Sequence, residues 1–259
     1  MVDLETMRLS VEDRVATVVL NRPRVLNCIN ERWLQDFGII LDRLARDERL
    51  RVVVIRGAGP AFCTGIDLTA LAAEEIGQPF FRGWEVAVRR LETLDPIVVA
   101  AIHSHCVGGG LQLALACDVR IAREDARFGV TAVKEGIIPG MGMWRIARHA
   151  GAGRAKRLAL TADVVDAATA CAWGLVDHVV SADDFEPAIA ERVDRLLAMA
   201  WTSTRLAKKL VHQAFDASWA DCLETFCEYQ REATASAEHQ AAMAEWRERR
   251  RAAAGVPTR

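Results

Sequence analysis

Short apolar runs alternate with longer amphipathic segments along the first part of the chain. Residues 15–20, 52–55 and 97–102 are rich in β-branched and aliphatic residues, which is typical of buried strands. From Asn30 to Asp47, apolar residues recur every three or four positions, and Asn30 stands where a helix N-cap is expected. A strand, a helix and a strand at this spacing predict a parallel strand pair joined by a right-handed crossover.

Further elements are predicted along the same part of the chain. Strand patterns occur at residues 119–122, around Phe128 and at 178–180, and helical patterns occur at residues 84–94 and 163–175. We expect these elements to extend the same core.

Two segments between these elements are rich in turn-forming residues. Residues 70–85 are mixed in polarity and contain Gly77, Pro79 and Gly83, which predicts a mobile loop. Residues 131–148 are predicted to form turns that lead into another helix.

The pattern changes after residue 182. From there on, apolar residues recur at helical spacing and the sequence shows no further strand pattern. We therefore predict a strand-containing core over residues 1–182 and a helical oligomerisation region over residues 183–259. Helices that cannot bury both faces on their own core commonly pack on a neighbouring subunit, so an oligomer is expected.

Composition narrows the class of protein. The chain has 259 residues, 51% of them hydrophobic, and a net charge of -2. It therefore lacks the excess of positive charge that is typical of nucleic-acid-binding proteins. Its seven cysteines include no C-x-x-C pair, which favours reduced thiols in a cytoplasmic protein. The N-terminus lacks the pattern of a signal peptide and no apolar run reaches membrane-spanning length, so no membrane partner is expected.

A cluster of three glycines, Gly108, Gly109 and Gly110, follows an apolar run and precedes residues of helical period. Backbone N–H groups at such a joint are not screened by side chains, and the helix adds a positive N-terminal end, so the joint can stabilise a negatively charged oxygen. Close packing of a strand against a helix explains the same glycines equally well. A second glycine-bearing strand end occurs at Gly65, where Asp67 can cap a following helix.

These motifs together resemble the crotonase, or enoyl-CoA hydratase/isomerase, superfamily. The resemblance extends over essentially the whole chain and rests on Asn21-Arg22-Pro23 with Asn27, AFCTGIDL at 61–68, GGGLQLALACDVRIA at 108–122 and IIPGMGMWRIAR at 137–148. It implies an α/β fold with a crotonase-like ββα spiral core and a helical C-terminal region. It also implies a homotrimer or hexamer that binds an acyl-CoA or acyl-carrier thioester.

The resemblance assigns roles to individual residues. The backbone N–H groups of Ile66 and Gly109 match the family's oxyanion hole for the thioester carbonyl. Arg24 is the candidate contact for the CoA phosphates. The remaining residues expected to border the substrate are Phe62, Gly65, Asp67, Gly108, Gly110, Ala132, Gly140, Met141 and Trp144.

The catalytic carboxylates of the family are missing. Hydratases carry two glutamates at the positions of Gln112 and Ala132, and some isomerases carry their acid at the position of Gly140. A glutamine amide has no useful pKa and cannot transfer a proton, so ordinary hydration is disfavoured. Glu135 is the nearest candidate for a lone acid, although a solvated surface charge is the commoner role for such a residue.

Three functions remain open. The first is enolate chemistry other than hydration, either decarboxylation, in which loss of CO₂ itself generates the enolate, or double-bond isomerisation. Residues 134–142 are similar to decarboxylating relatives, whose loop lysine and tail histidine have only Arg82 and His239 as counterparts here. The second is an atypical hydratase using Gln112-oriented water and Glu135, and the third is a thioester-binding protein without turnover. The sequence implies no metal or redox cofactor.

Overall fold

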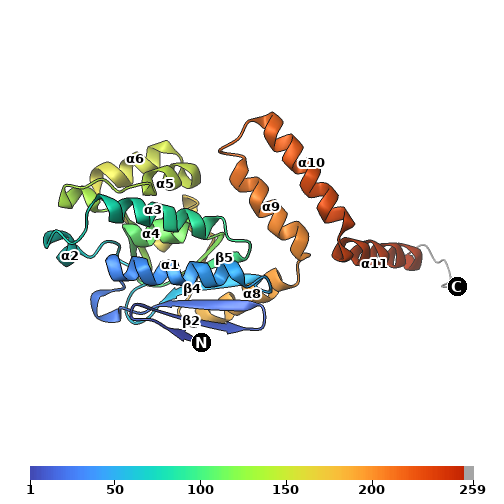
Figure 1. Cartoon of the computed structure of the whole chain (residues 1–259), viewed down its shortest axis with the longest axis horizontal. Coiled ribbons are helices and arrows are strands. Elements are labelled where there is room, and N and C mark those ends of the chain that lie inside the picture. Colours follow the sequence, from blue (N-terminus) through green and yellow to red (C-terminus); the bar gives the residue numbers. More distant parts are fainter. Residues whose placement is uncertain (254–259) are drawn as a thin grey trace. The chain divides into compact units, whose positions relative to one another are not determined.

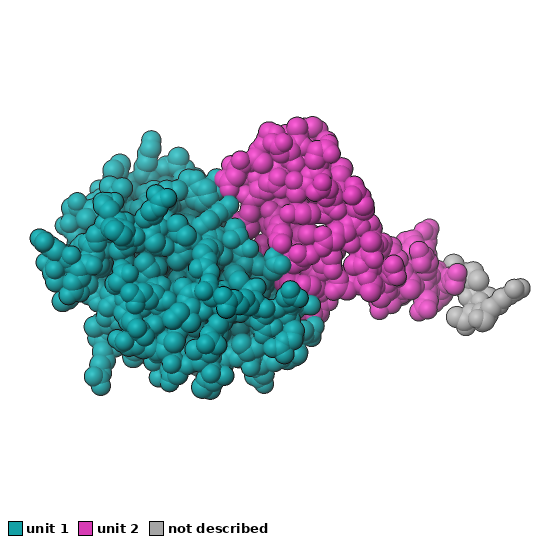
Figure 2. All heavy atoms as spheres, in the orientation of Figure 1, with its two compact units in different colours: residues 1–196 teal, residues 197–259 magenta. Residues whose placement is uncertain are grey.

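The computed structural model describes residues 1–253 and divides into two compact units (Figures 1 and 2). The first unit spans Met1–Leu196 and the second begins at Leu197. The whole predicted core, residues 1–182, lies within the first unit. Residues 254–259, the end of the predicted helical region, lie outside the described residues.

A seven-stranded sheet forms the centre of the first unit, with the strand order β1-β2-β3-β4-β5-β7-β10. The pairs from β3 to β10 are parallel, and β1, β2 and β3 pair in antiparallel fashion at one edge. The strands are β1 (Val2–Asp3), β2 (Met7–Glu12), β3 (Val15–Leu20), β4 (Val52–Gly57), β5 (Ile97–Ile102), β7 (Val119–Arg123) and β10 (His178–Val180). The predicted parallel pairing of β3 and β4 is confirmed, with Val15 opposite Val52.

Two long amphipathic helices, α1 (Glu31–Arg46) and α3 (Gln78–Glu92), lie side by side in the first unit (Figure 1). Asn30 caps α1 as predicted, because its side chain accepts a hydrogen bond of 3.0 Å from the backbone N–H of Trp33. The rings of Trp33 and Trp84 pack at 5.6 Å between centroids, which joins the two helices through buried aromatic surface.

The remaining helices of the first unit are shorter. They are η1 (Pro23–Val25), α2 (Leu68–Ala72), α4 (Gly109–Leu115), η2 (Ala132–Glu135), α5 (Gly142–Ala150), α6 (Ala152–Thr161), α7 (Ala167–Ala172) and α8 (Phe185–Leu197). The prediction that Asp67 caps a helix is confirmed, because its carboxylate accepts from the N–H groups of Thr69 and Ala70 at the start of α2.

A three-stranded sheet leads into the glycine joint. It contains β6 (His105–Val107), β8 (Arg127–Gly129) and β9 (Val164–Asp166), in the order β6-β8-β9. β6 ends directly before Gly108, and α4 follows at once. All seven residues of α4 are buried, so the start of this helix is fixed inside the fold.

Several predictions about local structure were wrong. The segment predicted as a mobile loop, residues 70–85, contains α2 and the first half of α3. Pro79 lies in the first turn of α3, where its missing N–H is not needed, so it starts the helix instead of breaking it. The helix predicted at residues 163–175 is a strand, β9, followed by the short helix α7.

The second unit is helical, as predicted, throughout the part that the structure describes. Its helices are α9 (Trp201–Gln213), α10 (Trp219–Ala235) and α11 (Ala237–Ala253). Within residues 1–253, no helix is both long and apolar enough to cross a membrane.

Candidate active site

The two glycine-bearing strand ends meet in the structure. Residues 62–67 run between β6 and Ile29: the N–H of Cys63 donates to the carbonyl of His105 at 3.0 Å, and the N–H of Ile29 donates to the carbonyl of Gly65 at 2.7 Å. The N–H of Asp67 then donates back to the carbonyl of Ile29 at 2.9 Å. This pairing uses the backbone groups on both sides of Ile66 and leaves its own N–H without a partner.

The N–H groups of Ile66 and Gly109 are the candidate oxyanion hole. Neither group donates a hydrogen bond to another residue within residues 1–253, and both residues line the same cavity of about 700 Å³. Gly65 brings them together. It has a φ of +86°, and a Cβ at this position would lie 2.7 Å from the nitrogen of Gly109, so a side chain cannot be accommodated there.

Apolar side chains form most of the cavity wall. The large apolar side chains among the lining residues include Leu68, Phe81, Trp84, Ile137, Ile138 and Met141. Such a wall suits an acyl chain, while the two free N–H groups suit the carbonyl oxygen at its head.

Gln112 is held firmly between two elements of the cavity. Its side-chain oxygen accepts a hydrogen bond from the indole N–H of Trp84 at 3.3 Å, and its amide nitrogen donates to the carbonyl of Pro139 at 2.9 Å. The residue is only 6% exposed. Gln112 therefore fixes the 137–141 segment to α3 and α4, and one of its amide hydrogens remains available to a ligand.

A carboxylate that the sequence analysis did not single out also lines the cavity. Glu85 extends from α3, and its oxygens accept hydrogen bonds from the N–H of Met141 at 2.9 Å and from Arg145 at 3.1 Å. Gln78, Phe81 and Glu85 line the cavity and recur at helical spacing, which is the sequence signal for this face of α3. The signal was missed because a loop was predicted at residues 70–85.

A thiol lines the cavity, and an ion pair lies next to the thiol. Burial raises the pKa of the Cys28 thiol to about 11, and the neighbouring Asp67 carboxylate adds to this effect. Burial alone would raise the pKa of Asp67, but hydrogen bonds from Cys28 and Arg22 outweigh it and hold that pKa below its usual value. Cys28 is therefore a neutral thiol at physiological pH, unsuited to act as a nucleophile.

The structure brings together most of the predicted site residues. The cavity is lined by Ile66, Gly108, Gly109, Gln112, Ala132, Glu135, Gly140 and Met141. Two further residues support it from behind: Gly65 lies against Gly109, and Asp67 pairs with Arg22.

Other predicted residues do not line the cavity. Phe62 is fully buried in the core, and Gly110 packs against the backbone of Cys63. Trp144 stacks against the guanidinium of Arg148, at 3.2 Å from ring centroid to carbon, and is not among the residues that line the cavity.

The remaining candidates are surface or tail residues. Arg24 and Arg82 are exposed and lie outside the cavity lining, and His239 lies on α11 in the second unit.

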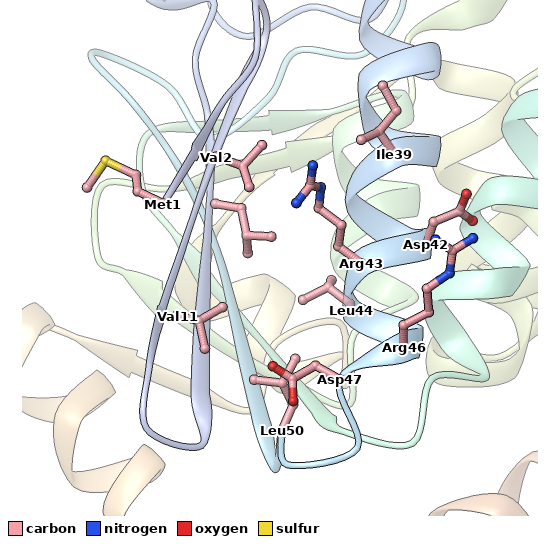
Figure 3. A pocket seen from close by; sticks show the side chains of 11 residues that line it. Met1, Val2, Val11, Ile39, Asp42, Arg43, Leu44, Arg46, Asp47 and Leu50 are labelled. Carbon is pink, nitrogen blue, oxygen red and sulfur yellow. The ribbon is translucent and has the colours of Figure 1, made fainter.

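A different hollow, of about 660 Å³, lies between the β1–β2 edge and α1 (Figure 3). Side chains from the edge strands and from α1 face each other across it. Ionised residues of α1, among them Asp42 and Arg43, border it, and none of the predicted site residues lies there. The cavity at Ile66 and Gly109 is therefore the candidate active site.

Comparison with known proteins agrees with the fold. The family model described as enoyl-CoA hydratase/isomerase matches residues 10–254. The chain is 33% identical to the short-chain-enoyl-CoA hydratase of Clostridium acetobutylicum, over 82% of each protein. It is 32% identical to the 1,2-epoxyphenylacetyl-CoA isomerase of Escherichia coli, over 88% of each.

A solved structure of enoyl-CoA hydratase from Bacillus anthracis superposes with a TM-score of 0.88 at 28% identity, covering 95% of this chain and 97% of that one. The predicted crotonase-like α/β fold with a helical C-terminal region is thus confirmed. The chain belongs to the enoyl-CoA hydratase/isomerase family.

Proposed function

We propose that the cavity binds an acyl-CoA or acyl-carrier thioester and stabilises its enolate in a reaction other than hydration. One observation carries the proposal. The N–H groups of Ile66 and Gly109, which donate to no other residue within residues 1–253, line the same cavity as Gln112 and Ala132, the two residues that the resemblance matches to the hydratase glutamates. Preorganised N–H donors contribute roughly 10²–10³-fold each to such a reaction, whereas an amide and a methyl group contribute no proton transfer.

Glu85 favours isomerisation over decarboxylation. A decarboxylase substrate brings its own carboxylate, and the cavity lining that the structure describes offers it the carboxyl groups of Glu85 and Glu135 but no lysine, arginine or histidine. An isomerase substrate is uncharged at the reacting carbons and requires a proton carrier. We therefore place double-bond isomerisation first and decarboxylation second.

Hydration with atypical residues is the alternative to these enolate reactions, because Glu135 also lines the cavity and several relatives are named hydratases. Glu135 is exposed in the turn of η2. An exposed side chain is not held in one position for proton transfer to a thioester bound in the cavity. Binding without turnover is the third candidate.

The experiment is an assay of crotonyl-CoA hydration by the purified protein, followed as loss of the enoyl-thioester absorbance. A Gln112→Glu/Ala132→Glu double variant and a trans-3-hexenoyl-CoA isomerisation assay accompany it. We expect an inert native protein in hydration, a gain of hydration in the double variant, and native conversion of the 3-enoyl to the 2-enoyl thioester. Rapid native hydration contradicts the proposal. Inertness in both native assays, with intact binding, contradicts isomerisation and leaves decarboxylation and thioester binding without turnover.

We further propose a cytoplasmic homotrimer or hexamer that needs no metal or redox cofactor. The second unit exposes large apolar side chains, among them Phe215, Trp219 and Trp246, which an assembly can cover. Light scattering after size exclusion tests the assembly, and a mass equal to one 28.5 kDa chain contradicts it. If the protein needs no metal, its turnover should be unchanged after dialysis against a chelator.

A further inference from the structure

Glu85 occupies an unusual place for a carboxylate in this cavity. It extends from α3, whereas the family's carboxylates that the resemblance identifies lie at positions 112, 132 and 140, on α4 and after β8. The Glu85 side chain is 23% exposed and contributes directly to the cavity lining. It is therefore accessible to a ligand in the cavity while being largely shielded from bulk water.

The carboxylate is held in one position by two donors. One oxygen accepts from the N–H of Met141 at 2.9 Å, and the other accepts from Arg145 at 3.1 Å. Arg145 is itself buried, with its side chain 5% exposed, and its Nε donates to Glu92 at 2.6 Å. Each carboxylate oxygen has a second acceptor position, so both oxygens can still receive a proton.

Gly140 lies directly beside the Glu85 carboxylate. Its φ is +58°, and a Cβ built on it would lie 2.7 Å from Oε1 of Glu85 and 3.4 Å from the amide nitrogen of Gln112. A side chain at position 140 would thus collide with the Glu85 carboxylate. The resemblance matches position 140 to the position at which some isomerases of the family carry their acid, and in this chain the Glu85 carboxylate lies beside that position.

We propose that Glu85 is the proton carrier of this site and acts on a 3-enoyl thioester, an inference that rests on the proposed function. The C2–H bond breaks and the proton moves to a Glu85 oxygen. The electron pair of the broken bond forms a dienolate, whose oxygen accepts hydrogen bonds from the N–H groups of Ile66 and Gly109. The same proton then forms the new C4–H bond while the double bond moves from C3–C4 to C2–C3. No other reactant is consumed, and one carboxylate suffices for both transfers.

A structural role is the alternative that the experiment must separate. Glu85 also fixes the backbone of Met141 to α3, and its removal would loosen the 137–141 wall of the cavity. Loss of that contact weakens substrate binding and lowers the unfolding temperature. Loss of a proton carrier instead slows proton transfer in the substrate that is already bound.

The experiment measures exchange of the C2 protons of butanoyl-CoA with D₂O by NMR, at saturating substrate, for the native protein, Glu85→Gln and Glu135→Gln. Butanoyl-CoA cannot isomerise or add water, so exchange reports removal of a C2 proton and its replacement on the carrier by a solvent deuteron, which the 23% exposure of the Glu85 side chain permits. We expect Glu85→Gln to slow exchange by about 10²-fold or more while the Kd for butanoyl-CoA changes by less than about tenfold. Glu48→Gln, the same change on an exposed carboxylate outside the cavity, is measured alongside and should retain the native exchange rate, whereas Glu135→Gln tests the other cavity carboxylate.

Each other outcome is decisive. Native-like exchange in Glu85→Gln, or loss of exchange in Glu135→Gln alone, overturns the inference. Binding of butanoyl-CoA by the native protein without any exchange also overturns it and leaves thioester binding intact, whereas absence of binding overturns the proposed function as well.

A second variant covers a folding defect. If Glu85→Gln does not fold, Glu85→Asp keeps the charge beside Arg145 and shortens the reach by one methylene. We expect it to slow exchange by at least about tenfold, since proton transfer depends on reach. An unchanged rate in Glu85→Asp overturns the inference.

Discussion

The indole N–H of Trp84 donates a hydrogen bond of 3.3 Å to the side-chain oxygen of Gln112, which fixes the direction of the amide. The amide nitrogen is thereby turned toward the carbonyl of Pro139. A glutamate at position 112 can accept from Trp84 but cannot donate to Pro139 when ionised. The surroundings of Gln112 are therefore built for an amide, and the glutamine is part of the architecture of the site.

This relationship predicts the cost of restoring a hydratase glutamate. Gln112→Glu should lower the free energy of unfolding by about 1–3 kcal/mol, because the Pro139 carbonyl loses its donor in a buried place and faces a carboxylate. Urea denaturation measures the change. Gln35→Glu, the same substitution on the exposed face of α1, serves as the control and should stay within about 0.5 kcal/mol. Equal effects at the two positions would refute the prediction.

Gly65 should tolerate no side chain. Gly65→Ala places a Cβ 2.7 Å from the nitrogen of Gly109 at a φ of +86°, so we expect a loss of turnover of about 10²-fold or more and a destabilisation of about 1–3 kcal/mol. Turnover of 3-enoyl-CoA and thermal unfolding measure the two effects.

The matched control is Gly38→Ala in the middle of α1, where nothing lies within 4 Å of the new Cβ. It should be stabilising by about 0.5–1 kcal/mol, since alanine is the better helix former. Native turnover in Gly65→Ala would show that Gly65 does not shape the site.

The buried cluster of Arg145 with Glu85 and Glu92 should be sensitive to the loss of its cation. Glu92 is 5% exposed, and Arg145→Ala leaves it without its shortest partner at 2.6 Å, so we expect a destabilisation of about 3–5 kcal/mol. Denaturant unfolding measures this. Arg157→Ala removes the surface pair with Asp163, in which Arg157 is 59% exposed, and should cost less than about 1 kcal/mol. A cost below about 1 kcal/mol for Arg145→Ala would contradict the account.

Cys28 should resist alkylation at neutral pH. Its pKa is raised to about 11, chiefly by burial, so iodoacetamide labelling of Cys28 should increase only as the pH approaches that value. The folded pKa lies above the ordinary value of 9.0, so the thiol's contribution to stability is complete below pH 9.0 and is lost as the pH rises toward about 11.

Peptide mass spectrometry of the labelled protein checks this, with the exposed Cys227 as an internal control that should be labelled first. Labelling of Cys28 at neutral pH as fast as Cys227 would show that the thiol is not protected. Saturating butanoyl-CoA should slow the labelling of Cys28 further, because Cys28 lines the cavity.

The parts of the fold that the sequence predicted best have strong local signals. β3 and β5 match their predicted ranges because β-branched and small apolar runs end at clear breaks, and α1 matches because Asn30 caps it. The start of α3 was missed because Pro79 and Gly83 resemble helix breakers. Pro79 does not disturb the helix, because it lies in the first turn. Gly83 lies close to Leu34: a Cβ added at Gly83 would be 3.1 Å from the Leu34 side chain. This tertiary contact cannot be predicted from the local sequence.

Part of the site was predicted from the sequence, because some of its residues belong to local motifs. The resemblance located Ile66, Gly109 and Gln112, because they belong to contiguous motifs. Glu85 lies in no such motif, and its partners Met141 and Arg145 are more than fifty positions away along the chain. Only the packing of α3 against the 137–145 segment brings them together.

The most direct test of the account is the ultraviolet difference spectrum of acetoacetyl-CoA on binding, because this β-keto thioester shows a separate absorbance as its enolate. If the N–H groups of Ile66 and Gly109 stabilise an enolate oxygen, the native protein should increase the enolate fraction at fixed pH, and Gly65→Ala should lose most of this increase. Binding of acetoacetyl-CoA with no increase in the enolate fraction would contradict the account.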